Sequence, residues 1–422
     1  MLLRRRGWHA SAMRPMAAIG QCLGALVAAS TLGACSSPVR EPAVPSTLTE
    51  RATVLGGLAK ARYFADTQVP EMTREADTAL DRERTQLGPA AGGRLPPANL
   101  LAVSGGGDNG AFGAGLLIGW TERGDRPEFK LVTGISTGAL IAPFAFLGPS
   151  YDGVLRHVYT EVDQSHIFAS RYLLTAVFDD ALKDTSPLFQ LISRHIDIQL
   201  MAAIAGEYRK GRLLLIGTTD LDAQRPVIWN IGAIAASGRP GALDLLRKIL
   251  LASAAIPVAF PPVLIDVDVD GTPYQEMHVD GGAIAQAFLY PQLLAASVQL
   301  RRGPLARERH AYVIRNGRLD PEWSSTDRRL FSIAGRAVDT MIHYSGQNDV
   351  YRLQTRAARD GVDFNLAYIG RDFTVEHTED FDPTYMRALF EYGRAQIKNG
   401  TAWKKSSPLL SPGQMQAGRR DE

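Results

Sequence analysis

The stretch Leu100-Leu101-Ala102-Val103-Ser104-Gly105-Gly106-Gly107-Asp108-Asn109-Gly110 decides the fold that we expect. Its first four residues form a short apolar run bounded by glycine, which is typical of a buried parallel strand. Residues 110–122 are expected to continue as a helix. Because consecutive backbone N–H groups at a helix N-terminus can stabilise an anion, the loop predicts an oxyanion site.

A second glycine-rich stretch, Gly134-Ile135-Ser136-Thr137-Gly138, presents a serine between two glycines. An apolar strand is expected before it, at 129–132, and an apolar helix after it, at 137–147. This strand–turn–helix context is typical of a nucleophile elbow, where small flanking residues permit a strained turn that exposes the hydroxyl. Ser136 is therefore the candidate nucleophile, and an incidental serine in a glycine-rich turn is the alternative.

The third stretch, Asp280-Gly281-Gly282, offers a carboxylate flanked by glycines. An aspartate has an ordinary pKa of about 3.9, so it is a weak base unless burial raises that pKa or direct contact aids the transfer. Asp280 is the candidate base for Ser136, and a simple turn residue is the alternative. A nucleophile, a base and an anion site are the parts that an acyl-transfer hydrolase needs.

Taken together, these stretches resemble the patatin-like phospholipase family, which has a Gly-Gly-Gly-x-Arg/Lys-Gly loop, a Gly-x-Ser-x-Gly elbow and an Asp-Gly-Gly or Asp-Gly-Ala. The segments Ala252-Ser253-Ala254-Ala255-Ile256-Pro257 and Phe260-Pro261-Pro262 are similar to a family segment that precedes the aspartate. The resemblance covers about residues 99 to 300. Asn109 departs from it, because the family usually has arginine or lysine there.

The resemblance implies a three-layer α/β/α fold with a mostly parallel central sheet. It also implies a lipid acyl hydrolase of the phospholipase A or lysophospholipase type, which uses a Ser136–Asp280 dyad without a histidine, a cofactor or a metal. The oxyanion would be held by the amides of Gly105, Gly106, Gly107 and Asp108. The expected substrate is a membrane lipid, and the oligomeric state stays open.

Other interpretations of the same residues remain. The first loop also fits the dinucleotide-binding pattern Gly-x-Gly-x-x-Gly, but the second strand ends without the acidic residue which that fingerprint needs. His310, His343 or His377 could complete a Ser-Asp-His triad of the α/β-hydrolase type. His278 lies two residues before Asp280, yet no paired-ligand spacing supports a metal site there. A non-catalytic envelope scaffold is the competing class.

Hydrophobic patterning predicts further strands and helices around these motifs. Strands are expected at 213–217, 226–229, 263–268, 274–279, 311–315 and 364–369, and Asp270-Gly271 predicts a two-residue hairpin. Helices are expected at 71–87, 187–205, 241–253, 327–346 and 383–399. Such alternation favours one three-layer α/β domain.

The N-terminus has the pattern of an export signal. Arg4-Arg5-Arg6 precedes an apolar stretch at 16–34, and Leu32-Gly33-Ala34-Cys35 resembles the lipobox of bacterial lipoproteins. Cys35 would then carry the lipid, and Ser36 after it favours an outer-membrane location facing the periplasm. An ordinary signal peptide or an uncleaved anchor is the alternative.

Composition bounds the remaining possibilities. The chain has 46 basic and 44 acidic residues, and the expected signal contains four of the arginines, so nothing in the charge balance suggests nucleic acid. Cys22 and Cys35 are the two cysteines, which leaves none for a disulfide. The predicted division is a signal peptide at 1–34, a lipidated tether at 35–47, a helical extension at 48–98, the acyl-hydrolase domain at 99–400 and a disordered tail at 401–422.

Overall fold

The computed structural model describes residues 40–88, 95–170, 183–289 and 307–408 of the 422-residue chain. The expected signal peptide lies outside the described residues. Among those that are described, no helix combines the length and apolar character needed to cross a bilayer.

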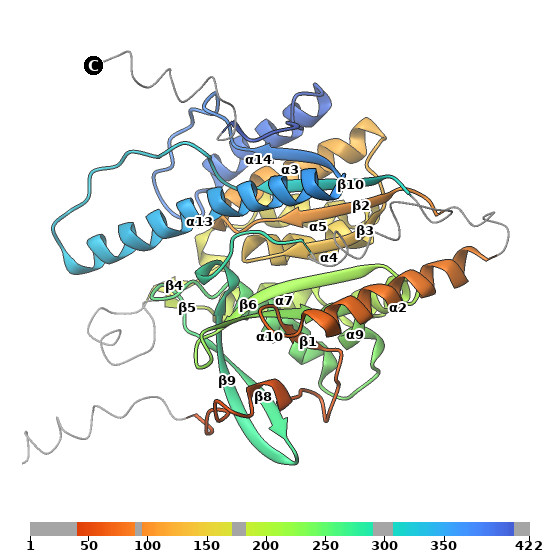
Figure 1. The fold of residues 1–422 in the computed structure, drawn as a ribbon. Coiled ribbons are helices and arrows are strands. Elements are labelled where there is room, and N and C mark those ends of the chain that lie inside the picture. The colour runs from red at the N-terminus through yellow and green to blue at the C-terminus, as the bar shows by residue number, and fades with distance from the viewer. Residues whose placement is uncertain (1–39, 89–94, 171–182, 290–306, 409–422) are drawn as a thin grey trace, which may run out of the picture.

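A nine-stranded sheet forms the centre of the domain (Figure 1). Five neighbouring strands run parallel in the order β11, β10, β2, β3 and β6. Their bounds are β2 Ala98–Val103, β3 Phe129–Gly134, β6 Leu213–Asp220, β10 Arg309–Arg315 and β11 Asp363–Tyr368. This parallel core brings the carboxyl ends of β2, β3 and β10, and the loops that follow them, to one edge of the sheet.

Antiparallel strands extend the sheet beyond β6. These are β1 Arg62–Phe64, β7 Arg225–Asn230, β8 Val263–Val269 and β9 Thr272–Asp280. β7 pairs with β6 and with β1, whereas β9 pairs with the far end of β6 and with β8. Asp270 (φ +53°) and Gly271 (φ +86°) form the hairpin between β8 and β9, which confirms the predicted two-residue turn. A separate pair, β4 Ala169–Ser170 and β5 Lys183–Asp184, lies outside the main sheet.

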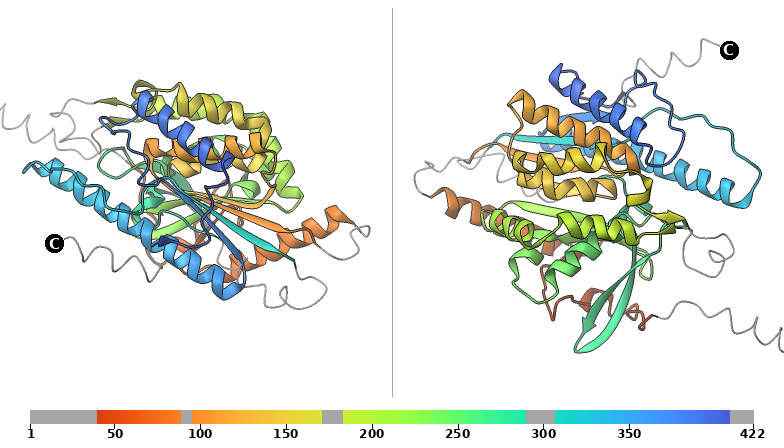
Figure 2. Two further views of the ribbon diagram at one scale, coloured as in Figure 1. Left: turned by 90° about the horizontal axis from the view of Figure 1, so that it is seen from above. Right: turned by 180° about the vertical axis from the view of Figure 1, so that it is seen from behind.

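Helices cover both faces of the sheet, as Figures 1 and 2 show. Successive β2 residues alternate between two buried clusters: Leu101 packs with α3 and α14, and Leu100 packs with α2 and α13. On the first face lie α3 Gly110–Arg123, α4 Thr137–Leu147, α5 Asp152–Thr160, α7 Ser186–His195, α10 Ala242–Ser253 and α14 Pro383–Lys398. α2 Val69–Leu87 and α13 Leu330–Asp360 cover the second. The predicted three-layer α/β/α architecture is confirmed.

Two of the predicted helix boundaries are wrong. The helix expected at 187–205 is two helices, α7 and α8 Ile198–Arg209, because Asp197 starts a new helix by accepting a hydrogen bond from the Leu200 amide (2.8 Å). α13 continues to Asp360, well beyond the predicted end at 346. Among the described residues, the sequence patterns also missed the short strands β1, β4 and β5 and the helices α5 and α9 Ile231–Ala236.

Both predicted end segments pack on the domain where the structure describes them. Arg40 forms a bidentate ion pair with Asp222 (3.1 and 2.7 Å), and Val44 is buried, so the tether expected at 35–47 ends by residue 40. At the other end, the ring of Trp403 packs 4.9 Å from that of Trp120, and the backbone of Lys404 pairs with β11. Residues 401–408 therefore belong to the domain, and residues 409–422 lie outside the described part.

Candidate active site

Ser136 occupies a strained backbone turn between β3 and α4. Its φ of +56° and ψ of −129° are rare for a residue with a side chain. A Cβ on Gly134 would lie 2.3 Å from the Gly138 carbonyl oxygen, and one on Gly138 would lie 2.2 Å from the Val103 carbonyl oxygen. Both flanking positions must therefore be glycine, which is the geometry expected of a nucleophile elbow.

The Ser136 hydroxyl lies beside the Asp280 carboxyl group, and its interaction with the ionised form lowers the pKa of Asp280. The Asp280 carboxylate accepts a hydrogen bond from the Gly282 amide (2.7 Å). Burial raises the pKa of Asp280 to about 7, and the Ser136 hydroxyl and the Gly282 amide reduce the rise without cancelling it. The carboxyl group thus combines a position beside the serine with a pKa near neutrality, and both properties favour an aspartate as a base.

Neighbouring elements fix the positions of both residues. The Asp280 amide donates to the Ala255 carbonyl (2.9 Å), and β9 pairs with β6 as far as Asp280. At the end of α10, the Ser253 hydroxyl donates to the Gly217 carbonyl (2.7 Å) and accepts from the Ser136 amide (3.0 Å). The Ala-Ser-x-Ala segment therefore braces the elbow.

The glycine-rich loop lies directly against Ser136. A Cβ on Gly105 would lie 3.1 Å from the Ser136 Cβ. The Gly105 amide donates to the Gln286 carbonyl (3.1 Å), and its role in holding an oxyanion stays a prediction. No acceptor for the amides of Gly106 and Gly107 is found within the described residues, and these two stay available to a ligand.

Asp108 follows the loop in the 3₁₀ turn Gly107–Asn109. Its carboxylate accepts from His377 Nε2 (2.7 Å) and from the Phe381 amide (2.9 Å). Next to it, Asn109 Oδ1 accepts from the Tyr385 hydroxyl (2.6 Å). These two side chains tie the loop to the segment that leads into α14, and they leave the backbone amides as the groups that can face a substrate.

Three residues that the sequence analysis missed complete the surroundings of the loop. Gln286 joins the Asp-Gly-Gly turn to the loop, since its Nε2 donates to the Gly282 carbonyl (3.0 Å). Asn316 fixes Ser104 through two hydrogen bonds of 2.9 Å, and Arg315 lies beside them. No local pattern marks these residues, because only the folded sheet places β10 next to β2.

Each candidate triad histidine has a partner away from the nucleophile. His310 pairs with Asp363 (3.1 Å), His343 with Gln347 (2.9 Å) and His377 with Asp108. His278 is buried between Thr218 and Glu276. In the part of the chain that the structure describes, none of them hydrogen-bonds Ser136 or Asp280.

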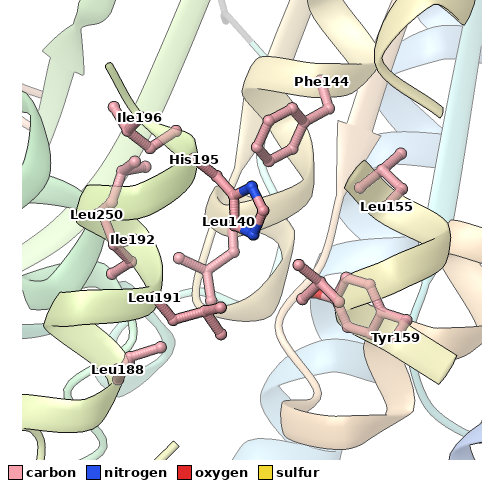
Figure 3. Close-up of a pocket in the computed structure, with 11 residues that line it drawn as sticks. Leu140, Phe144, Leu155, Tyr159, Leu188, Leu191, Ile192, His195, Ile196 and Leu250 are labelled. Carbon is pink, nitrogen blue, oxygen red and sulfur yellow. The ribbon is translucent and has the colours of Figure 1, made fainter. Parts of the chain in front are cut away.

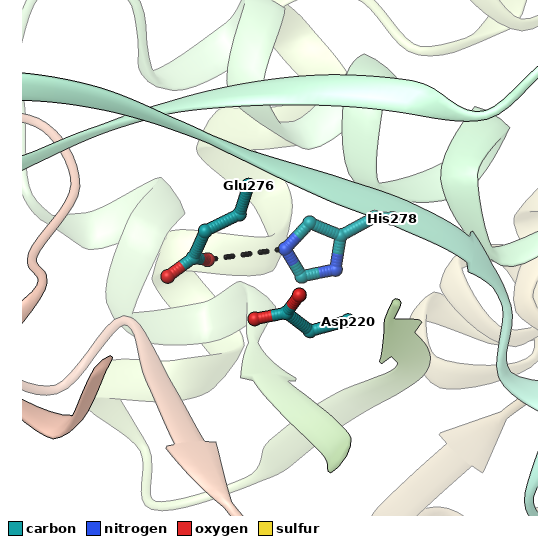
Figure 4. A group of neighbouring side chains, drawn as sticks. All are labelled: Asp220, Glu276 and His278. Atoms are coloured by element: carbon teal, nitrogen blue, oxygen red, sulfur yellow. Dashed lines mark hydrogen bonds and ion pairs between the residues drawn. The ribbon is translucent and has the colours of Figure 1, made fainter. Parts of the chain in front are cut away.

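Asp220, Glu276 and His278 form a buried cluster whose ligand atoms lie within 4.8 Å of one another (Figure 4). Such a set could suit a metal ion, but the Arg62 guanidinium pairs with both oxygens of Glu276. Burial opposes ionisation of Glu276, yet Arg62 and His278 outweigh it and lower the pKa of this carboxyl to about 2. With an arginine already in place as counter-ion, the cluster is better described as an ion network that ties β1 to β9.

An apolar pocket opens between α4, α5, α7 and α10 (Figure 3). The pocket is open to solvent, with about 420 Å³ of space between its walls. These walls include Leu140 and Phe144 of α4 and Leu191 of α7. Tyr159, also in the wall, shares a hydrogen bond of 2.6 Å with the hydroxyl of Thr137, the residue after the nucleophile. The pocket thus follows the helix that begins at the elbow.

Residues 101–290 match the family model described as patatin-like phospholipase. This chain contains a patatin-like phospholipase domain. The matched range of the patatin-like domain includes Gly105–Gly107, Ser136 and Asp280, whereas β10 and α13 lie beyond it. No curated protein sequence matches the chain.

Two solved structures are similar over much of the chain. VipD from Legionella pneumophila is 12% identical, with a TM-score of 0.31, over 73% of this chain and 67% of its own. ExoU from the type III secretion system of Pseudomonas aeruginosa, solved in complex with SpcU, is 14% identical, with a TM-score of 0.28. That match covers 62% of this chain and 53% of ExoU.

Proposed function

We propose that this protein is a lipid acyl hydrolase, of the phospholipase A or lysophospholipase type, that cleaves carboxylic esters with a Ser136–Asp280 dyad. One observation carries the proposal: a serine in a strained elbow lies beside a buried carboxyl group, that of Asp280, whose pKa burial raises to about 7. The match of residues 101–290 to the patatin-like phospholipases supports lipid ester hydrolysis as the reaction class.

The reaction follows from these contacts. Ser136 Oγ attacks the ester carbonyl while Asp280 takes the hydroxyl proton, and the amides of Gly106 and Gly107 hold the oxyanion. Protonated Asp280 then gives the proton to the departing alcohol, which leaves an acyl-serine. Water attacks this ester, Asp280 takes a proton from the water, and the fatty acid departs as Ser136 is reprotonated. A pKa near neutrality suits a group that must both accept and donate a proton.

The apolar pocket suits the acyl chain of such a substrate. Its position along α4, with Tyr159 bonded to Thr137, supports binding of a single chain near the elbow. Nine of the eleven residues in its walls are aliphatic or Phe, and only Tyr159 and His195 carry polar groups, so the walls favour hydrocarbon over a polar headgroup.

We further propose that Cys35 carries a lipid and holds the enzyme at the bacterial outer membrane, facing the periplasm. The chain is fixed to the domain at Arg40, five residues after Cys35. An extended segment of that length spans at most about 18 Å, so the anchor would keep the domain close to its bilayer.

The test compares residues 36–422 of the wild type with Ser136→Ala on a panel of phospholipids, lysophospholipids and simple esters. We expect the wild type to release fatty acid and the variant to release none, with both showing the same circular dichroism spectrum. Equal release by the two proteins would refute Ser136 as the nucleophile, and no release by either would favour a scaffold role.

A separate test addresses the anchor. In a bacterial host that processes lipoproteins, Cys35→Ser should accumulate as an uncleaved precursor, whereas the wild type should partition with the outer membrane. A wild-type protein with an unmodified N-terminus would contradict the lipoprotein assignment.

A further inference from the structure

Arg315, the last residue of β10, places its guanidinium in the protein interior behind the glycine-rich loop. The residue is 4% exposed. One terminal nitrogen, Nη1, lies 3.4 Å from both Ser104 Oγ and the Gly105 carbonyl oxygen, and 3.5 Å from Gln286 Oε1. Its Nε has no hydrogen-bond partner, and no carboxylate among the described residues forms an ion pair with it.

A buried cation without a close counter-ion is costly, so its presence needs a reason. Burial lowers the pKa of Arg315 to about 10, against the attraction of Asp349, and the group therefore stays charged at neutral pH. The fold makes room for it, because a Cβ on Gly346 of α13 would lie 2.6 Å from the Arg315 Cζ.

The contact with Gly105 connects this charge to the oxyanion site. The Gly105 carbonyl accepts one hydrogen bond from Ser104 Oγ (2.7 Å) and a longer one from Arg315. The N–H at the other end of the same peptide group belongs to Gly106, which has no acceptor within the described residues. Donors on a carbonyl polarise its peptide and strengthen the hydrogen bond that the N–H can give.

We propose that Arg315 is a positioning residue that polarises the Gly105–Gly106 peptide and adds positive charge behind the oxyanion. The inference rests on the proposed esterase reaction. It gives a source for positive charge at the loop, because residues 104–110 contain no basic side chain of their own. Arg315 lies outside residues 101–290, so the family match does not assign it.

This role has a kinetic signature. A buried group that acts through a peptide does not touch the substrate, so its loss lowers kcat and leaves KM nearly unchanged. Removal of a direct oxyanion donor costs about 10²–10³ in kcat, and we expect a group one peptide further away to cost roughly tenfold to hundredfold.

The experiment uses the full chain and a short-chain p-nitrophenyl ester. It compares wild type with Arg315→Gln, Arg315→Lys, Ser136→Ala and the control Arg352→Gln, which removes an exposed arginine on α13 that pairs with Asp349. We expect Arg315→Gln to lose about tenfold to hundredfold in kcat with KM within threefold, Arg315→Lys to recover most of the loss and Arg352→Gln to match wild type. An unchanged kcat in folded Arg315→Gln, or an equal loss in Arg315→Lys, would overturn the proposal.

Chemical rescue separates charge from packing. In Arg315→Ala, added guanidinium should restore part of kcat, whereas urea, which is neutral and similar in shape, should not. Equal rescue by both compounds would indicate cavity filling and overturn the proposal. If wild type is no more active than Ser136→Ala, the proposed function fails first and this inference falls with it. Activity in wild type without an Arg315 effect refutes the inference alone.

Discussion

The hydroxyl of Ser136 lies beside the buried carboxyl group of Asp280 and favours the ionised form of that group. No histidine of the described residues hydrogen-bonds either group. In the reaction that we propose, the carboxylate does by itself what a histidine does in a triad. Burial raises the pKa of Asp280, which makes the carboxylate a stronger base. Several measurable properties of the protein follow from this arrangement.

The first prediction concerns the pH dependence of hydrolysis. Asp280 acts as a base only when ionised, and burial raises its pKa to about 7. Below this pH, kcat/KM should fall tenfold per pH unit, and above it kcat/KM should level off. His377 is the relevant control, because its hydrogen bond to Asp108 raises the pKa of the imidazole. The decrease in kcat/KM at acidic pH should persist in His377→Gln. If this decrease is absent from the variant, the assignment to Asp280 is wrong.

Asp280→Asn should abolish hydrolysis and at the same time stabilise the protein at alkaline pH. The folded pKa of about 7 exceeds the unfolded value of about 3.9, so the folded state binds more protons between these values. The free energy of unfolding therefore falls as pH rises from about 4 to about 7. Above that range Asp280 is ionised in both states, and the stability does not fall further on its account. A difference of about three pKa units lowers the free energy of unfolding by at most about 4 kcal/mol.

Thermal unfolding at two pH values checks this linkage. Relative to wild type, the variant should gain Tm at pH 8 and gain little at pH 4. Asparagine keeps the shape of the carboxylate but cannot accept the proton, so the comparison isolates ionisation from packing. A difference in Tm that does not change with pH would show that Asp280 ionises freely in the fold.

Ser136→Gly and Ser136→Ala should both be inactive but should differ in stability. Ser136 has a φ of +56°, a conformation that costs a residue with a side chain about 1–3 kcal/mol and costs glycine little. The glycine variant should therefore unfold at a higher denaturant concentration than the alanine variant. Equal midpoints would mean that the elbow relaxes in solution and stores no strain.

Asn109→Ala should reduce kcat/KM by less than tenfold, or about 1.4 kcal/mol. The Asn109 side chain accepts a hydrogen bond from the Tyr385 hydroxyl, so it braces the loop and does not face the nucleophile. Tyr385→Phe breaks the same hydrogen bond from the other side and should have a similar effect. A thousandfold loss in Asn109→Ala, without one in Tyr385→Phe, would make the amide itself a catalytic group.

The sequence predicted the parts of the site that local geometry determines. The elbow needs glycine at 134 and 138 because carbonyl oxygens lie within 2.3 Å of where a Cβ would be, and such requirements leave a pattern in the sequence. Gln286 and Arg315 left no such pattern, because their roles come from contacts that form only in the folded sheet. For the same reason, the sequence could not show that the Gly105 amide bonds the Gln286 carbonyl. The packing of the chain end, such as that of Trp403 on Trp120, could not be predicted from the sequence either.

The last prediction tests the apolar pocket as the acyl-chain site. Leu191 is nearly buried in its wall, so Leu191→Trp should fill the pocket and reduce binding of long chains. Each buried methylene contributes about 0.8 kcal/mol, or about fourfold in binding. The ratio of kcat/KM for decanoyl to butanoyl esters should therefore fall by one or more orders of magnitude.

Ile198→Trp provides the matched control, because Ile198 is 54% exposed at the start of α8 and is not part of the pocket wall. This variant should keep the wild-type ratio, and Leu191→Ala should shift the preference toward longer chains. Hydrolysis of the butanoyl ester should persist in all three variants, since the dyad is untouched. If folded Leu191→Trp keeps the wild-type chain-length profile, the acyl chain binds elsewhere, and the pocket between α4 and α7 is a packing defect of the helical layer.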